Sequence, residues 1–140
     1  MNTKNENVVI IQADDSSWHY RPWGNYTWQD FMLTGERRTN PKLRAKGRFN
    51  NMRYVTRGLE RSVPHETIQH MWDIIDGMTI RKEDMQFFSL FEHEGKQRIV
   101  HNQSARKKFV HDFETDDIIT TNVMAQDTGY CSVMFLSEEY

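Results

Sequence analysis

The sequence predicts an α+β fold in which one main amphipathic helix packs on an antiparallel sheet of about five strands. Three observations predict it. Apolar residues between positions 62 and 78 recur at helical spacing, the segments on both sides are strand-like, and turn-forming residues separate further strand-like runs. A helix with one apolar face has to be covered, and a sheet built from its neighbours in the chain is the simplest cover.

The main helix is expected between Ser62 and Met78. Its apolar face consists of residues at i, i+3, i+4 and i+7: Ile68, Met71, Trp72 and Ile75. Ser62 is suited to cap the start, and Pro64 is tolerated in a first turn because its missing N–H would be unpaired there. Gly77 is suited to end the helix. The prediction is therefore a helix with one wet side and one buried side.

The predicted sheet consists of short runs rich in β-branched and aromatic residues. They lie at residues 52–59, 85–93, 97–103, 108–113, within 114–126, and at 130–136. The sequence HEGK predicts a tight hairpin because Gly95 can adopt a positive φ. The hairpin register then pairs three sets of residues: His93 with Lys96, Phe88 with His101, and Leu90 with Ile99.

An N-terminal extension over residues 1–49 is expected to pack on a core domain of residues 50–140. It begins with a predicted strand at residues 8–13 and a turn-prone break at residues 14–17. A short aromatic helix is expected over residues 27–33, because Thr27 and Asp30 have the spacing of a capping box and Gly35 can end it.

Aromatic residues crowd the middle of this extension, and they have three interpretations. The candidate partner-binding residues among them are Trp18, Tyr20, Trp23, Tyr26 and Trp28. Folded back, they would close the core, since each brings much apolar area. Exposed, they would form a hot spot for a protein partner. Stacking on nucleotide bases is the weakest interpretation, because Arg21 is the only basic side chain in the cluster.

Charge is distributed unevenly although the net charge is only −2. Residues 37–61 hold nine of the eighteen Lys and Arg residues and one acid, whereas residues 62–140 hold fourteen acids and seven bases. The candidate binding residues of this basic band are Arg37, Arg38, Lys42, Arg44, Lys46 and Arg48. They are interpreted as a solvated loop, as a phosphate-contacting arm, or as a surface for acidic proteins.

The densest acidic group follows His111 and Asp112 in the sequence and consists of Glu114, Asp116 and Asp117. It lacks the glycine and the regular alternation of a calcium loop. A solvated loop is the default interpretation. The functional interpretation is that these carboxylates imitate the phosphates of a nucleic acid and face Lys and Arg of a target protein.

No catalytic, metal-binding or cofactor-binding residue is predicted. His65 and His70 are five residues apart, whereas a zinc-protease helix needs two histidines four apart. Glycine-flanked serines, phosphate-cradling loops and dinucleotide fingerprints are missing from the sequence. Cys131 lies in an apolar run, which is typical of a structural thiol. The single cysteine and the absence of a long apolar run predict a cytoplasmic protein that does not enter membranes.

Several motifs in order carry a resemblance to a known family: NNMRYVTRGL, the VP-led helix with MWDIID, MQFF with QRIVHNQ, and a chain ending in SEEY. Residues 50–140 resemble a small family of Gram-positive bacteria and their phages, the family with domain of unknown function 960. The resemblance implies a fold unit and a mobile-element setting, and it supplies no catalytic residues. The aromatic and basic extension is an addition to the family's core.

These observations together favour binding over catalysis. The expected function is that of a non-enzymatic accessory protein of a phage or mobile element, which binds and blocks a host protein. A host RNA-guided nuclease, the target of anti-CRISPR proteins, is one concrete candidate. The first alternative is a nucleic-acid-binding protein that uses Arg37 to Arg61. The second is a metal-dependent enzyme that uses the histidines and carboxylates.

Overall fold

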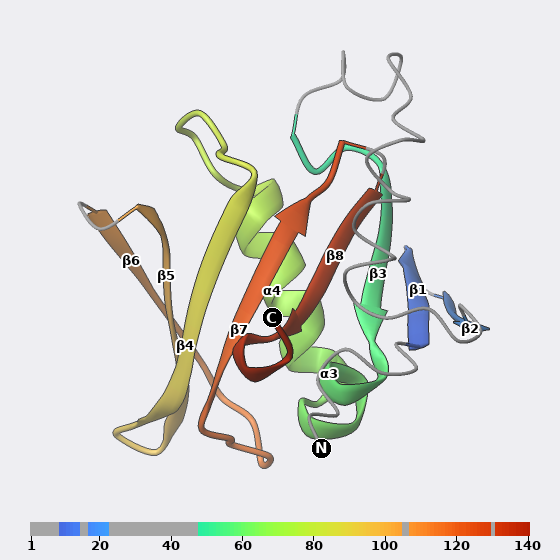
Figure 1. Ribbon diagram of the computed structural model, residues 1–140. Helices are drawn as coiled ribbons and strands as arrows, with labels where there is room; N and C mark the ends of the chain where they lie inside the picture. The colour runs from blue at the N-terminus through green and yellow to red at the C-terminus, as the bar shows by residue number, and fades with distance from the viewer. Residues whose placement is uncertain (1–8, 15–16, 23–47, 105–106, 130) are drawn as a thin grey trace.

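The computed structural model describes residues 9–14, 17–22, 48–104, 107–129 and 131–140 of the 140-residue chain, the first two segments by their backbone alone. One eight-stranded sheet runs through these residues (Figure 1). The strands are β1 Val9–Asp14, β2 Ser17–Pro22, β3 Met52–Thr56, β4 Met85–His93, β5 Lys96–Ser104, β6 Lys107–Phe113, β7 Thr121–Asp127 and β8 Cys131–Leu136. The helices are α3 Arg57–Ser62, α4 His65–Asp76 and the 3-10 turn η1 Ser137–Glu139.

The predicted antiparallel sheet of about five strands is wrong. The strand order is β2-β1-β3-β8-β7-β4-β5-β6, and β3 pairs with β8 in parallel, so the sheet is mixed. Six of its strands lie between residues 52 and 136, and two more come from the N-terminal part. Periodicity identifies strands but carries no information on which distant strands pair or in which direction, and that is why the prediction failed.

The segment 52–59, expected to be one strand, is divided between β3 and α3. Thr56 is the N-cap of α3, and its hydroxyl accepts a hydrogen bond from the backbone N–H of Leu59 at 3.2 Å. α3 ends at Ser62, so Ser62 does not cap the main helix as predicted. α4 starts at His65 with Pro64 as its N-cap, and it ends at the predicted Gly77.

The buried face of α4 is the predicted one. Ile68, Met71, Trp72 and Ile75 are at most 1% exposed. α4 lies across one face of the sheet, behind β7 and β8 in Figure 1. The strands supply the other half of the core from residues that face α4: Val55, Phe88, Leu90, Ile99, Val123, Ala125 and Met134. Burial of these side chains on both sides is the main force that holds helix and sheet together.

The predicted hairpin between β4 and β5 is confirmed in all three of its residue pairs. Glu94 and Gly95 form its turn, both at positive φ. β1 lies one residue later than the strand expected at residues 8–13. β2 was not predicted, because its residues were interpreted as the end of a turn-prone break and the start of an aromatic cluster. The predicted aromatic helix at residues 27–33 lies outside the described residues.

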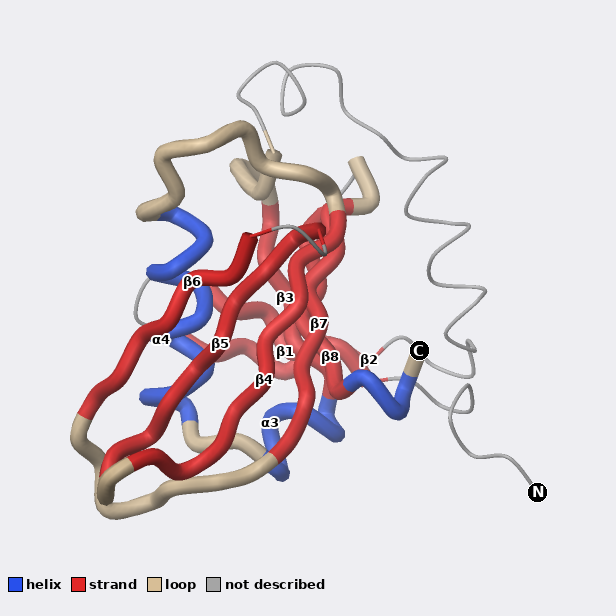
Figure 2. Tube along the Cα trace, turned by 90° about the vertical axis from the view of Figure 1, so that its left-hand side faces the viewer, coloured by secondary structure: helices blue, strands red, loops and turns tan. Residues whose placement is uncertain are grey.

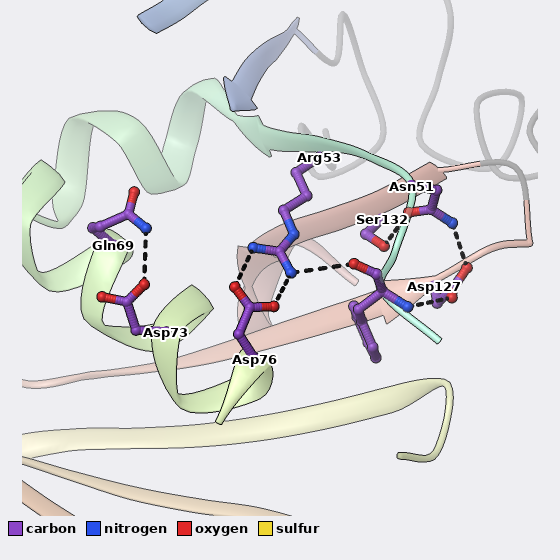
Figure 3. Close-up of polar contacts among 8 residues, drawn as sticks. Asn51, Arg53, Gln69, Asp73, Asp76, Asp127 and Ser132 are labelled. Carbon is purple, nitrogen blue, oxygen red and sulfur yellow. Dashed lines mark hydrogen bonds and ion pairs between the residues drawn. The ribbon is translucent and has the colours of Figure 1, made fainter. Parts of the chain in front are cut away.

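A polar clamp fixes the start of β3 to the turn between β7 and β8 (Figure 3). The buried Asp127 carboxylate accepts hydrogen bonds from the backbone N–H groups of Phe49 (2.8 Å) and Gly129 (2.7 Å), and from the Asn51 amide (3.1 Å). Phe49 is 1% exposed at a φ of 64°. The three bonds replace the water that this buried charge loses, and they tie Phe49 to a strand 78 residues away.

A second clamp joins β3 to the end of α4. The guanidinium of Arg53 pairs with both carboxylate oxygens of Asp76 and donates to the carbonyl of Phe49 at 3.2 Å (Figure 3). It also lies over the Trp72 ring, 4.7 Å from the ring centre. Arg53 therefore contributes to packing as well as to charge pairing. None of the helices in the described ranges is long and apolar enough to cross a bilayer.

Candidate functional site

The candidate site is a groove between α4 and β6, which lie next to each other in Figure 2. Alternation along β6 places Phe109, His111 and Phe113 on the face that α4 covers in part. The facing flank of α4 carries residues that recur every three or four positions: Glu66, His70, Asp73, Ile74 and Gly77. Helical spacing on one wall and strand alternation on the other thus build the groove.

One aromatic contact joins the two walls. The ring of His70 stacks on Phe113 with 3.9 Å between ring centres and 18° between ring planes. Phe113 also packs against the hydrophobic core and is only half-buried. The contact holds the end of β6 against the helix and leaves aromatic surface open to the groove.

Two adjoining hollows make up the groove. The first, of about 310 Å³, is lined by His70, Asp73, Ile74, Gly77, Ile99, His111, Asp112 and Phe113. The second, of about 490 Å³, is lined by Glu66, Glu114, Thr115, Asp116 and Asp117. Glu66 lies one helical turn before His70, and Glu114 directly follows Phe113, so the two hollows are lined by neighbouring residues of the same two segments. Both are open hollows rather than closed cavities.

Negative charge dominates the groove. Among the described residues, neither a lysine nor an arginine lines the hollows. Five carboxylates there form no ion pair with any part of the chain that the structure describes: Glu66, Asp73, Glu114, Asp116 and Asp117. Asp73 accepts one hydrogen bond, from the Gln69 amide at 3.1 Å (Figure 3). Carboxylates that repel one another without a bound cation favour a positively charged ligand.

The titratable neighbours do not cancel this charge. Burial lowers the pKa of His111, although Asp112 partly opposes the shift. His111 is therefore neutral at pH 7. Asp112 is held by Arg98 through two hydrogen bonds of 2.8 Å, which lower the pKa of its carboxyl. Asp112 is thus compensated, whereas the five other carboxylates depend on solvent or on a ligand.

A buried histidine lies behind the groove. His101 is 1% exposed, and its ring stacks between Phe88 and Phe109. Its Nε2 lies 2.6 Å from the Gln86 side-chain oxygen, while the Gln86 amide donates to Gln103. Because that oxygen can only accept, Nε2 carries a proton. Burial, with a smaller contribution from His111, lowers the pKa of His101 to about 4. Its surroundings identify His101 as a structural residue.

The other groups suited to chemistry are similarly placed. Burial raises the pKa of the Cys131 thiol to about 12 despite the Thr128 hydroxyl 3.7 Å away. A thiol of this kind is not a nucleophile at neutral pH. In the described ranges, no group of three or more His, Cys, Asp or Glu side chains is arranged to hold a metal ion.

The predicted site residues have different outcomes. Trp18 and Tyr20 lie on β2, of which only the backbone is described. Outside the described residues lie Trp23, Tyr26, Trp28, Arg37, Arg38, Lys42, Arg44 and Lys46. Arg48 is exposed. The structure brings Glu114, Asp116 and Asp117 together in one hollow, with Glu66 opposite. Arg53, also in the basic band, is engaged by Asp76.

The prediction from sequence missed the α4 residues that line this site, and it missed the part played by Phe113. Glu66 and His70, four residues apart, were considered as a metal pair and interpreted as helix neighbours, and Phe113 was predicted only as part of a strand. A signal was available, because Glu66, His70 and Asp73 recur at helical spacing on the flank next to the apolar stripe. Which strand would face that flank could not be read from the sequence.

Comparisons with known proteins place this site on a fold without an assigned activity. The chain is 25% identical in sequence to a protein of unknown function from Enterococcus faecalis with a solved crystal structure, at a TM-score of 0.56. The match covers 63% of this chain and 89% of that one. No curated protein matches the chain. Residues 52–139 match the model of the family described as staphylococcal protein of unknown function, DUF960, and the chain belongs to this family.

Proposed function

We propose that this protein is a non-enzymatic protein-binding protein, and that its groove between α4 and β6 takes a basic segment of a target protein. The observation that carries the proposal is the set of five carboxylates that converge on the groove without an ion pair in the described chain. Their charge is of one sign, and four of the five line the same hollow. Such a concentration of negative charge attracts cationic ligands and speeds their encounter.

The chemistry of the walls favours arginine within such a segment. A guanidinium can form two parallel hydrogen bonds with a carboxylate and can also stack on an aromatic ring. The site offers both kinds of partner on consecutive residues, since Phe113 lines the first hollow and the exposed Glu114 lines the second. A lysine would gain the charge attraction alone. We therefore expect arginine-rich segments to bind more tightly than lysine-rich segments of equal charge.

One class of target with the required charge is a nuclease whose nucleic-acid channel is lined with Lys and Arg. An acidic protein that occupies such a channel excludes the nucleic acid by competition. The proposal thus includes the role of a phage or mobile-element accessory protein that blocks a host RNA-guided nuclease. An inhibition assay with a purified nuclease of this type would show cleavage that decreases with protein concentration and returns when substrate is added in excess.

Isothermal titration of the full chain with an extended arginine-rich peptide tests the proposal directly. The triple variant Glu114→Gln, Asp116→Asn, Asp117→Asn removes three groove charges and should weaken binding between about threefold and a hundredfold, since each exposed ion pair contributes about 0.2–1 kcal/mol. Affinity for the unchanged protein should fall as salt rises, because the attraction is screened.

A matched control separates the groove from net charge. The triple variant Glu83→Gln, Asp84→Asn, Glu138→Gln removes the same charge from exposed positions outside the groove. It should bind the peptide nearly as well as the unchanged protein does. Equal losses in the two triple variants, or no binding of the peptide at low salt, would rule out the groove as the binding site.

A further inference from the structure

The edge strand β6 is open along its outer side. It is last in the strand order, and within the described residues β5 is the only strand that pairs with it (Figure 2). An edge strand has unpaired N–H and C=O groups that accept another strand. Val110, in the middle of β6, is 54% exposed, the most of any large apolar side chain on strands β3 to β8 as far as the structure describes them. The edge therefore combines open hydrogen-bonding groups with an uncovered apolar side chain.

The two faces of β6 carry different residues. Asp112 pairs with Arg98 on the face away from α4, and alternation places Val110 and Lys108 on that same face. On the face toward α4, the Lys107 ammonium lies over the Phe109 ring, 5.2 Å from its centre. Charges are also sorted along the strand, since Lys107 and Lys108 begin it and its one acid, Asp112, lies near its end.

We propose that two copies of this chain pair through β6, antiparallel and around a two-fold axis at Val110, so that one sheet continues from copy to copy. In this register each residue faces a complement in the second copy: Val110 faces Val110, Lys108 faces Asp112, and Phe109 faces His111. Opposite charges, apolar pairs and aromatic pairs directly across two strands are all stabilising. Because the axis repeats each contact, a single self-complementary strand suffices for the dimer.

The residues of β6 favour this register over the registers whose axis lies one residue away. Opposite residues in an antiparallel pair point to the same face, so the sheet can continue only if outer residues meet outer residues. Moving the axis by one residue places Val110 opposite Asp112 in one direction and opposite Lys108 in the other. Either choice leaves the apolar side chain against a charge. The register centred on Val110 alone matches apolar with apolar and base with acid.

This pairing goes beyond the proposed function and does not rest on it. Lys107 of the second copy would lie opposite Phe113, at the border of the groove, and the helix wall with Glu66 and Asp73 would stay open. The side chain of Lys108 lies on the opposite face of the sheet. A variant at Lys108 can therefore lose the dimer while the groove still binds peptide.

Sedimentation velocity of the full chain across a range of concentrations tests the dimer. The unchanged protein should sediment with twice the chain mass of 16.8 kDa. Lys108→Glu places an acid opposite Asp112, and Asp112→Lys places a base opposite Lys108, so each variant alone should raise the dimer dissociation constant at least about tenfold. Mixed together, the two variants restore both opposite-charge pairs and should form a heterodimer.

Mixing the two variants also tests whether either one loses the dimer because it is misfolded. A misfolded variant could not regain dimer formation on mixing, and circular dichroism melts check that each variant is folded. Arg61→Glu, an equal charge reversal on α3, should leave the dimer unchanged. An unchanged protein that stays monomeric, or a dimer indifferent to Lys108→Glu, would overturn the pairing, as would a mixture that remains monomeric.

Discussion

Two regions of the sheet, called here the flank of β3 and β8 and the flank of β5 and β6, are built in opposite ways, although β1 and β2 lie beyond β3 in the strand order. On the flank of β3 and β8, all six residues of β8 are buried, and two polar clamps centred on Asp127 and Arg53 fix the strands to their surroundings. On the flank of β5 and β6, only two residues of β6 are even half-buried. The clamps of the first flank bind groups of their own chain, whereas five carboxylates of the groove beside β6 form no ion pair within the described residues. The difference indicates that stability resides on one flank and binding on the other.

The largest expected effect concerns Trp72, the buried residue of α4 that Arg53 of β3 covers. Trp72→Ala should lower the free energy of unfolding by about 3–5 kcal/mol, because it leaves a cavity and removes the ring under Arg53. Phe113→Ala truncates an aromatic residue on the open flank and should cost only about 1 kcal/mol, since Phe113 is half exposed. Urea unfolding followed by circular dichroism measures both. Equal costs would contradict the division into two flanks.

The next effect concerns the buried clamp. Asp127→Ala removes the acceptor of three hydrogen bonds and leaves two backbone N–H groups without partners, at a cost of about 3 kcal/mol. Asp116→Ala deletes a carboxylate on the open flank and should change stability by less than about 0.5 kcal/mol. The same urea titration compares them. A stable Asp127→Ala protein would show that the clamp is not needed for folding.

The third effect depends on pH and comes from the buried His101 on β5. The pKa of His101 is about 4 in the folded chain, below its ordinary 6.5, so the unfolded chain binds the proton more tightly. The resulting stabilisation is fully present above pH 6.5 and is lost as pH falls toward 4, to a limit of about 3 kcal/mol. Urea midpoints of the unchanged protein and of His101→Phe, measured at neutral pH and near pH 4, should differ in their pH dependence. Parallel curves would mean that another group titrates.

The smallest expected effect concerns the carboxylate of Glu139, near the C-terminus. Burial raises the pKa of Glu139, although the Thr56 hydroxyl (2.7 Å) and the Leu136 N–H (2.9 Å) both donate to its carboxylate. A raised carboxyl pKa means that stability falls as pH rises from the ordinary pKa of 4.5 through the raised value, and that the charge opposes folding at neutral pH. Glu139→Gln keeps an acceptor without the charge and should stabilise the protein at neutral pH by under about 1 kcal/mol. Glu139→Ala loses both bonds and should destabilise it. A thermal melt at two pH values distinguishes these outcomes.

Prediction from sequence succeeded where a local pattern was sufficient. The buried face of α4 and the register of the β4–β5 hairpin follow from spacing within a dozen or so residues, because side-chain direction repeats with the backbone period. The acidic residues Glu114, Asp116 and Asp117 were also identified as a group. The opposite wall of the groove was not, since His70 and Phe113 are distant in the chain and their contact depends on how the sheet is ordered.

The sequence by itself determined the periodic elements of this protein, the polarity of each face and the separation of basic from acidic segments. The tertiary structure alone decided that β3 and β8 run parallel, that Asp127 reaches Phe49, and that β6 ends at an open edge beside α4. The physical reason is that backbone geometry fixes the direction of side chains over a few residues. Pairing of distant strands depends instead on the total burial and hydrogen bonding of the whole chain, which no single segment encodes.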